Sequence, residues 1–153
     1  MNCIKYKYTK NSASIEDIYK CLFICDINFI PMLSERVNIK QYSAKLYERA
    51  LNFEAWCGSE LIALVSIYIN DEMNYGYISN VNIIAEHSKR GITSQLMKNA
   101  LKYMTNKNIF VAKLEVHRNN LSAIHLYEKF NFEIIDILNN DFYVMELKIK
   151  EDV

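Results

Sequence analysis

One stretch, Tyr77–Met104, most constrains how this chain of 153 residues can fold. It begins with alternating residues that predict a half-buried strand over residues 77–84. One face of that strand is expected to hold Ile78, Asn80 and Asn82, and the other Tyr77, Ser79, Val81 and Ile83. A polar loop with a single glycine follows, and apolar residues then recur at steps of three and four up to Met104. This spacing predicts an amphipathic helix directly after the loop.

The loop, His87–Gly91, has features of an anion-binding turn. Gly91 has no Cβ, so the backbone there can approach a ligand closely. The unpaired N–H groups of the first helical turn favour an anion, and Lys89 and Arg90 add positive charge beside them. A strand-to-helix turn that needs glycine only for its geometry explains the same residues. The loop alone therefore leaves both interpretations open.

Short helices and strands alternate through the rest of the chain. We expect further strands at residues 4–8, 52–57, 61–69, 109–116, 132–137 and 142–149. We expect further helices after Ser14, over residues 39–51 and over residues 122–130. This order predicts an α+β fold, with a mixed sheet covered by helices, in a single domain over residues 1–153.

Composition narrows the classes of function. The 18 basic and 18 acidic residues give a net charge of zero, which argues against a nucleic-acid-binding protein. Apolar stretches are of strand length and residues 1–10 hold no signal-peptide core, so we expect a cytoplasmic protein that does not enter the membrane. The cysteines show no CxxC spacing, which predicts reduced structural thiols and no metal site. They are Cys3, Cys21, Cys25 and Cys57.

Two segments resemble motifs of the GNAT family of N-acetyltransferases. The first, Ser88–Thr93, aligns with the family's motif A loop, R/Q-x-x-G-x-G/A. Gly91 matches, whereas Ser88 and Thr93 replace the usual residues at either end. The Thr93 hydroxyl can still donate to a phosphate, and the backbone donors do not depend on side chains. By this resemblance the pyrophosphate of acetyl-CoA is held by Ser88, Lys89, Arg90, Gly91, Ile92 and Thr93.

The second segment, Leu114–Phe132, is similar to motif B, L-E-V-x-x-x-N-x-x-A-x-x-L-Y-E-K-x-G-F. Every specified position agrees except the glycine, which is Asn131. Asn is the usual second choice where a left-handed residue must follow a helix. The resemblance covers residues 50–148 in outline and implies a GNAT-like acyl-CoA N-acyltransferase fold. That fold has a mixed, largely antiparallel seven-stranded sheet flanked by helices on both faces.

The resemblance also implies an enzyme, an acetyl-CoA-dependent N-acetyltransferase whose primary-amine acceptor attacks directly in a ternary complex. Val81 and Ile83 would bind the pantetheine arm like an added strand, with the Ile83 amide on the thioester carbonyl. Asn120 would bind the cofactor or cap the helix that follows it. Tyr127 would be the general acid for the departing thiolate, and Glu115 the base for the amine.

These assignments have structural alternatives. Tyr127 could be an ordinary core tyrosine and Glu115 an exposed strand residue. His117 is a weaker candidate base, because we expect its side chain to point away from the site. A non-catalytic acyl-CoA-binding or regulatory module of the same fold is a rival function, and an interaction domain without a ligand is another.

The acceptor is the part that the sequence defines least. A small molecule such as an amino sugar, an amine or an antibiotic, a protein N-terminus and a lysine all suit this scaffold, and a longer acyl group would too. Four residues before residue 50 could contact a substrate, although a solvated helix face explains them equally well. They are Glu35, Tyr42, Tyr47 and Glu48. A homodimer is compatible with the sequence but not required by it.

Overall fold

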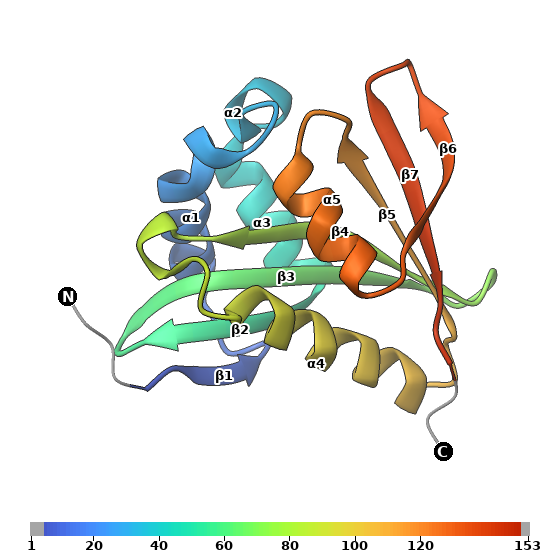
Figure 1. Ribbon diagram of the computed structural model, residues 1–153. Helices are drawn as coiled ribbons and strands as arrows, with labels where there is room; N and C mark the ends of the chain where they lie inside the picture. The colour runs from blue at the N-terminus through green and yellow to red at the C-terminus, as the bar shows by residue number, and fades with distance from the viewer. Residues whose placement is uncertain (1–4, 151–153) are drawn as a thin grey trace.

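The computed structural model describes residues 5–150, which form one sheet with helices packed on both of its faces (Figure 1). In chain order the elements are β1 (Lys7–Lys10), α1 (Ile15–Cys25), η1 (Asp26–Asn28), α2 (Leu33–Arg36), α3 (Ile39–Arg49), β2 (Leu51–Cys57), β3 (Glu60–Asn70), β4 (Tyr75–Ile83), η2 (Ala85–His87), α4 (Ile92–Asn106), β5 (Val111–His117), α5 (Leu121–Lys129), β6 (Glu133–Leu138) and β7 (Phe142–Lys148). Within this range no helix combines the length and apolar character needed to cross a membrane.

The sheet has seven strands in the order β1-β2-β3-β4-β5-β7-β6. Every neighbouring pair is antiparallel except β4 and β5, which are parallel. Helices α1 and α3 lie behind the sheet in Figure 1, and α4 and α5 lie in front of it. We call these two sides the α1/α3 face and the α4/α5 face. The predicted α+β fold, with a mixed, largely antiparallel sheet between helices, is confirmed.

The parallel strands β4 and β5 part halfway along their length. They pair from Gly76 with Ala112 to Ile78 with Leu114. Beyond that point β4 continues to Ile83 beside β3, and β5 continues to His117 beside β7. The facing edges of the two strands therefore carry backbone N–H and C=O groups that no strand pairing satisfies.

A bulge in β4 sits at the point where the strands part. Asn80 pairs with Ser66 and Ile78 pairs with Ile67, so Ser79 is an extra residue in β4. Before the bulge, a Cβ on Gly76 would meet Met104 of α4, whereas Asn82, after it, bonds to thiols of α1. The even-numbered residues thus change faces along the strand.

The predicted division of this strand into two faces is therefore wrong. Ile78 does not share a face with Asn80 and Asn82, because strict alternation fails at a bulge. As a result Val81 and Ile83 face α4 and α5, while Tyr77 faces α3. Polar residues before the loop thus reach α1, and apolar residues line the other side.

Element boundaries follow from local chemistry. Ser14 caps α1 in a capping box with Asp17, with bonds of 3.1 and 2.9 Å, as the sequence predicted. Asn131 takes the left-handed conformation after α5, at φ 71°, also as predicted. Several bounds differ from the expected ones: β1 begins at Lys7, α3 ends at Arg49, β4 begins two residues early and β5 two residues late. The one-turn helix α2 is additional. The predicted start of β1 at residue 4 lies outside the described residues.

Among residues 5–150, one carboxylate is buried, that of Glu54 on β2. Its oxygens accept hydrogen bonds from the Thr9 hydroxyl and from the amides of Ser12 and Ala13, at 2.7, 2.8 and 3.0 Å. These bonds satisfy a charge that would otherwise be costly to bury. Glu54 therefore anchors the segment between β1 and α1 to the sheet, and we assign it a structural role.

Candidate active site

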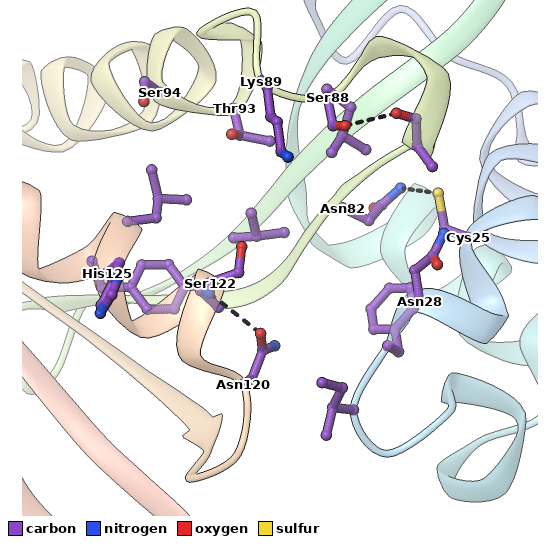
Figure 2. A pocket seen from close by; sticks show the side chains of 18 of the residues that line it. Cys25, Asn28, Asn82, Ser88, Lys89, Thr93, Ser94, Asn120, Ser122 and His125 are labelled. Atoms are coloured by element: carbon purple, nitrogen blue, oxygen red, sulfur yellow. Dashed lines mark hydrogen bonds between the residues drawn. The ribbon is translucent and has the colours of Figure 1, made fainter.

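A cavity of about 780 Å³ opens on the α4/α5 face, beside the parting of β4 and β5. Its volume lies within the range of small-molecule sites. Figure 2 shows it bounded by the start of α4, by α5 and by the end of α1. It is lined by Cys25, Asn28, Phe29, Ile30, Val81, Asn82, Ile83, Ala85, Ser88, Lys89, Gly91, Thr93, Ser94, Asn120, Ser122, Ala123, His125, Leu126, Tyr127 and Lys129.

The end of the cavity at α4 suits an anion. Gly91 is the N-cap of α4, no side chain caps this helix, and its first turn has no acidic residue. The amides of Ile92, Thr93 and Ser94 therefore have no partner within the helix, and the helix dipole favours negative charge beside them. Lys89 and Lys129 line the same cavity, and none of the described lining residues is acidic. The predicted anion-binding turn thus has the geometry it needs.

Gly91 is required by backbone conformation and leaves space in front of it. Its φ is +77°, in the left-handed region, and a Cβ built there would meet no atom within 4 Å. Lys89, two residues earlier, is also left-handed at φ 62°. The loop therefore has two left-handed residues within three positions, and the space beside the Gly91 Cα is open.

Three of the predicted loop residues use their side chains in contacts within the protein. Arg90 donates from Nη1 to the Tyr6 hydroxyl at 2.9 Å, and that hydroxyl lies 2.8 Å from Nδ1 of the buried His87. Ile92 is 2% exposed and packs in the core, so only its backbone can face a ligand. The Ser88 hydroxyl donates to the Ala85 carbonyl at 2.7 Å. Sequence analysis placed His87 in the loop but missed its contact with Tyr6, because nothing in the linear pattern brings residue 6 to this loop.

Helix α5 supplies the other wall. The Asn120 side chain accepts a bond from the Ala123 amide at 3.3 Å, so Asn120 is the N-cap and also lines the cavity. Tyr127 is 6% exposed and lines the cavity together with Val81 and Ile83. Burial, and then the nearby Tyr77, raise the pKa of Tyr127 well above that of a free tyrosine. The hydroxyl is therefore protonated and available as a donor at neutral pH.

Glu115 is not a lining residue of this cavity, and its side chain is exposed on the α1/α3 face. Tyr77 lies beside it, because Tyr77 pairs with Lys113, two residues before Glu115 on the same side of β5. Burial first, and then the charge and hydrogen bonding of Glu115, raise the pKa of Tyr77. Glu115 acts on the Tyr77 phenol and Tyr77 acts on the Tyr127 phenol, so Tyr77 lies within electrostatic reach of both candidate residues. Sequence analysis did not single out Tyr77.

His117 does not line the cavity, as expected from its alternation with Val116, and it shares the face of Glu115. Two residues apart on β5, they lie on the same side of the strand. The His117 ring packs edge-on against Phe142, with centroids 5.1 Å apart, and its Nδ1 accepts from the Asn119 amide at 3.1 Å. These contacts fix the ring beside β7.

Cys25 and Asn82 line the α1 side of the cavity. The Asn82 amide donates to Cys21 and Cys25, at 3.2 and 3.4 Å, and both cysteines are free. The hydrogen bond from Cys21 lowers the pKa of Cys25, while the same bond and burial raise the pKa of Cys21. Within residues 5–150 no group of three or more histidine, cysteine or acidic side chains is arranged to hold a metal ion.

Sequence comparison identifies relatives of the chain. The model of the "Acetyltransferase (GNAT) family" matches residues 14–132. An "N-alpha-acetyltransferase" from Saccharolobus solfataricus is 34% identical over 64 residues, which are 41% of this chain and 38% of that protein. The "GCN5-related N-acetyltransferase 6, chloroplastic" from Arabidopsis thaliana is 26% identical over 103 residues, 63% of this chain and 36% of the relative. The chain thus spans well under half the length of these relatives.

Solved structures share the whole fold. The PaiA N-acetyltransferase from Thermoplasma acidophilum in complex with coenzyme A superposes with a TM-score of 0.77 at 21% identity, covering 95% of this chain and 99% of that one. Ard1 from Thermoplasma volcanium gives a TM-score of 0.78 at 19% identity, covering 94% and 99%.

Proposed function

Because this chain belongs to the acetyltransferase (GNAT) family, we propose that it transfers an acetyl group from acetyl-CoA to a primary amine. The observation that carries this proposal is one cavity that joins an uncapped helix N-terminus to a buried tyrosine hydroxyl, with no acidic residue among its described lining. The helix N-terminus suits the phosphates of the donor, and the tyrosine hydroxyl can protonate a departing thiolate. The solved relative with coenzyme A supports the same choice of donor.

The residues present fit the phosphates and the pantetheine arm of the donor. Ser88, Lys89, Gly91 and Thr93 line the cavity around the open amides of α4, and Ile92 contributes its backbone N–H. Arg90 acts through Tyr6 rather than by direct contact. The pantetheine arm would follow Val81 and Ile83, where the edge of β4 has no strand partner.

Two proton steps complete the proposed reaction. The neutral acceptor nitrogen attacks the thioester carbonyl carbon, and the bond from that carbon to sulfur breaks. Tyr127 gives its proton to the sulfur, and Glu115 takes the proton that the acceptor nitrogen loses, directly or through Tyr77 or a water. Since Tyr127 and Glu115 lie on opposite faces, the acceptor would enter from the α1/α3 face and meet the donor at the parting of β4 and β5.

The relatives support a peptide N-terminus as the acceptor. Two of them are named N-alpha-acetyltransferases, and one solved relative is the NatC complex bound to Gag peptide and CoA. Another is Arabidopsis thaliana NAA60 in complex with a bisubstrate analogue. We therefore place a peptide α-amine ahead of amino sugars, small amines and lysine.

Ligand-dependent stability and thiol release test this proposal together. At a hundredfold excess over its Kd, acetyl-CoA should stabilise the fold by about 2.7 kcal/mol, and adding a peptide amine should release CoA thiol. No stabilisation at millimolar acetyl-CoA would contradict the donor assignment. Stabilisation without thiol release across an amine panel would favour the non-catalytic acyl-CoA-binding module, a rival that the replaced Ser88 and Thr93 positions permit.

A further inference from the structure

The α1/α3 face holds two opposite charges close to the parting of β4 and β5. Glu115 pairs with Val144, and His117 pairs with Phe142, so Glu115 and Phe142 are diagonal neighbours on one side of the sheet. The Arg36 guanidinium, at the end of α2, lies over the Phe142 ring, 5.3 Å from its centroid. A guanidinium and a carboxylate therefore occupy the same patch.

Both charges act on the Tyr77 phenol. Glu115 raises the pKa of the Tyr77 phenol after burial, and Arg36 lowers it, so both charges are within electrostatic reach of one hydroxyl. Burial raises the pKa of Tyr42, and the Ser79 hydrogen bond and the charge of Arg36 offset part of this rise; the Tyr42 hydroxyl is 3.1 Å from the Ser79 hydroxyl at the bulge. The charges thus flank the point at which an amine would meet the donor.

Neither charge is neutralised by the protein. Within residues 5–150 the ion pairs closer than 4 Å are Lys20 with Glu16 and Lys113 with Glu146, both at 3.9 Å. Arg36 and Glu115 are both exposed and are not paired with each other. A ligand with the opposite arrangement of charges would therefore be able to form an ion pair with each of them.

We propose that the acceptor carries an anionic group a few bonds from its reacting amine, and that Arg36 is the specificity-determining residue that binds this group. The inference rests on the proposed function and names its substrate class. The ammonium form of the amine is drawn to Glu115, and a carboxylate can bond to the planar guanidinium through two parallel N–H groups. Free acidic amino acids and peptides with an acidic first or second residue share this chemistry.

Matched acceptors test the inference. We would compare kcat/KM, from CoA thiol release, for peptides that differ only by Asp against Asn or Glu against Gln, placed at position one or two. Free glutamate against glutamine forms a separate arm, which distinguishes amino acids from peptides. The wild-type protein should favour the acidic member of at least one pair about tenfold, the effect of one charge-assisted contact of about 1.4 kcal/mol.

Substitutions at Arg36 test whether this residue causes the preference for acidic acceptors. Arg36→Gln should reduce the acidic-to-neutral ratio to about one, and Arg36→Glu should favour a lysine at the same position instead. Lys40→Gln is the matched control, because Lys40 is an exposed cation of the neighbouring α3 that lies over Tyr19. The control should keep the wild-type ratio.

Different outcomes would contradict the role of Arg36 and the acetyltransferase activity itself. Turnover of neutral and acidic acceptors at equal rates, or a preference that survives Arg36→Gln, overturns the role of Arg36 and leaves acetyl transfer intact. A ratio that falls equally in Lys40→Gln also overturns it, since general attraction of anions would then suffice. Acetyl-CoA binding without turnover of any acceptor overturns both proposals.

Discussion

The two faces of the sheet use different chemistry at the same opening. On the α4/α5 face the anion-binding end is made of backbone amides, Gly91 and the N-terminus of α4. On the α1/α3 face Arg36, Tyr77 and Glu115 present side-chain charges and hydroxyls. Backbone donors survive most substitutions, whereas side-chain donors do not. Departures from the family motif at Ser88 and Thr93 are therefore tolerable, and variation on the opposite face should change the acceptor.

The largest expected effect is on donor binding and comes from Gly91→Val. Valine must adopt a φ of +77° and place its branches in the empty space before the amides, so acetyl-CoA should no longer stabilise the protein. Gly58→Val is the matched control, because Gly58 has a φ of +60° and equally open surroundings in the β2–β3 turn. Both variants should lose about 1–2 kcal/mol of stability. Equal acetyl-CoA affinity in the two variants would show that Gly91 serves only the geometry of the turn and not ligand binding.

The next effect, on turnover, comes from Tyr127→Phe. The ring remains, so the melting temperature and acetyl-CoA affinity should change little, while turnover at neutral pH should fall by about a hundredfold or more. A CoA thiol with a pKa like that of cysteine, about 8.5, leaves without help in alkaline buffer, so the defect should shrink there. Because the pKa of Tyr127 is raised, wild-type turnover should show no loss from its ionisation below about pH 10.

A rate-limiting chemical step must be shown first, for example by a single-turnover measurement. On such an acceptor, wild-type turnover by Tyr127→Phe would remove this residue from the mechanism. The α4/α5 face would then contribute binding alone, and the proton for sulfur would have to come from water or from the other face.

The sequence predicted features that depend on nearby residues better than features that depend on the whole sheet. The loop around Gly91, the N-cap at Asn120 and the buried Tyr127 depend on neighbours within a few residues, and spacing or motif identified them. The bulge at Ser79 was missed, because one extra residue changes no composition and breaks no motif. It decides, however, which side chains reach each face.

Contacts between distant segments could not be predicted from the sequence either. Tyr6 meets His87 and Arg90 across more than eighty residues, with bonds of 2.8 and 2.9 Å. Arg36 lies over Phe142 from the other end of the chain. Such pairs need the strand order and register, which periodicity alone does not provide.

A smaller effect on donor affinity is expected from Tyr6→Phe. Its hydroxyl joins Arg90 to the buried His87, and the loss of two hydrogen bonds of about 1 kcal/mol each should loosen the loop. The Kd for acetyl-CoA should rise about five- to tenfold with kcat unchanged. Tyr8→Phe makes the same chemical change in the same segment, on an exposed side chain, and should leave Kd as it is. A fall in kcat with constant Kd would contradict a positioning role.

The smallest effect is expected from Thr93→Ala, which removes the only hydroxyl of the first turn of α4 that stands at a motif position. The Thr93 amide remains in place, and alanine favours the helix by a few tenths of a kcal/mol, so the melting temperature should not fall. If backbone amides hold the phosphates, the Kd for acetyl-CoA should rise less than about threefold, since a solvent-facing hydroxyl contributes under 1 kcal/mol. A rise of tenfold or more, measured by isothermal titration, would show that side chains carry binding on this face as well. The two faces would then differ in burial and no longer in their use of backbone or side-chain donors. Substitutions at the motif positions would in that case change the choice of acyl donor as readily as substitutions on the other face change the acceptor.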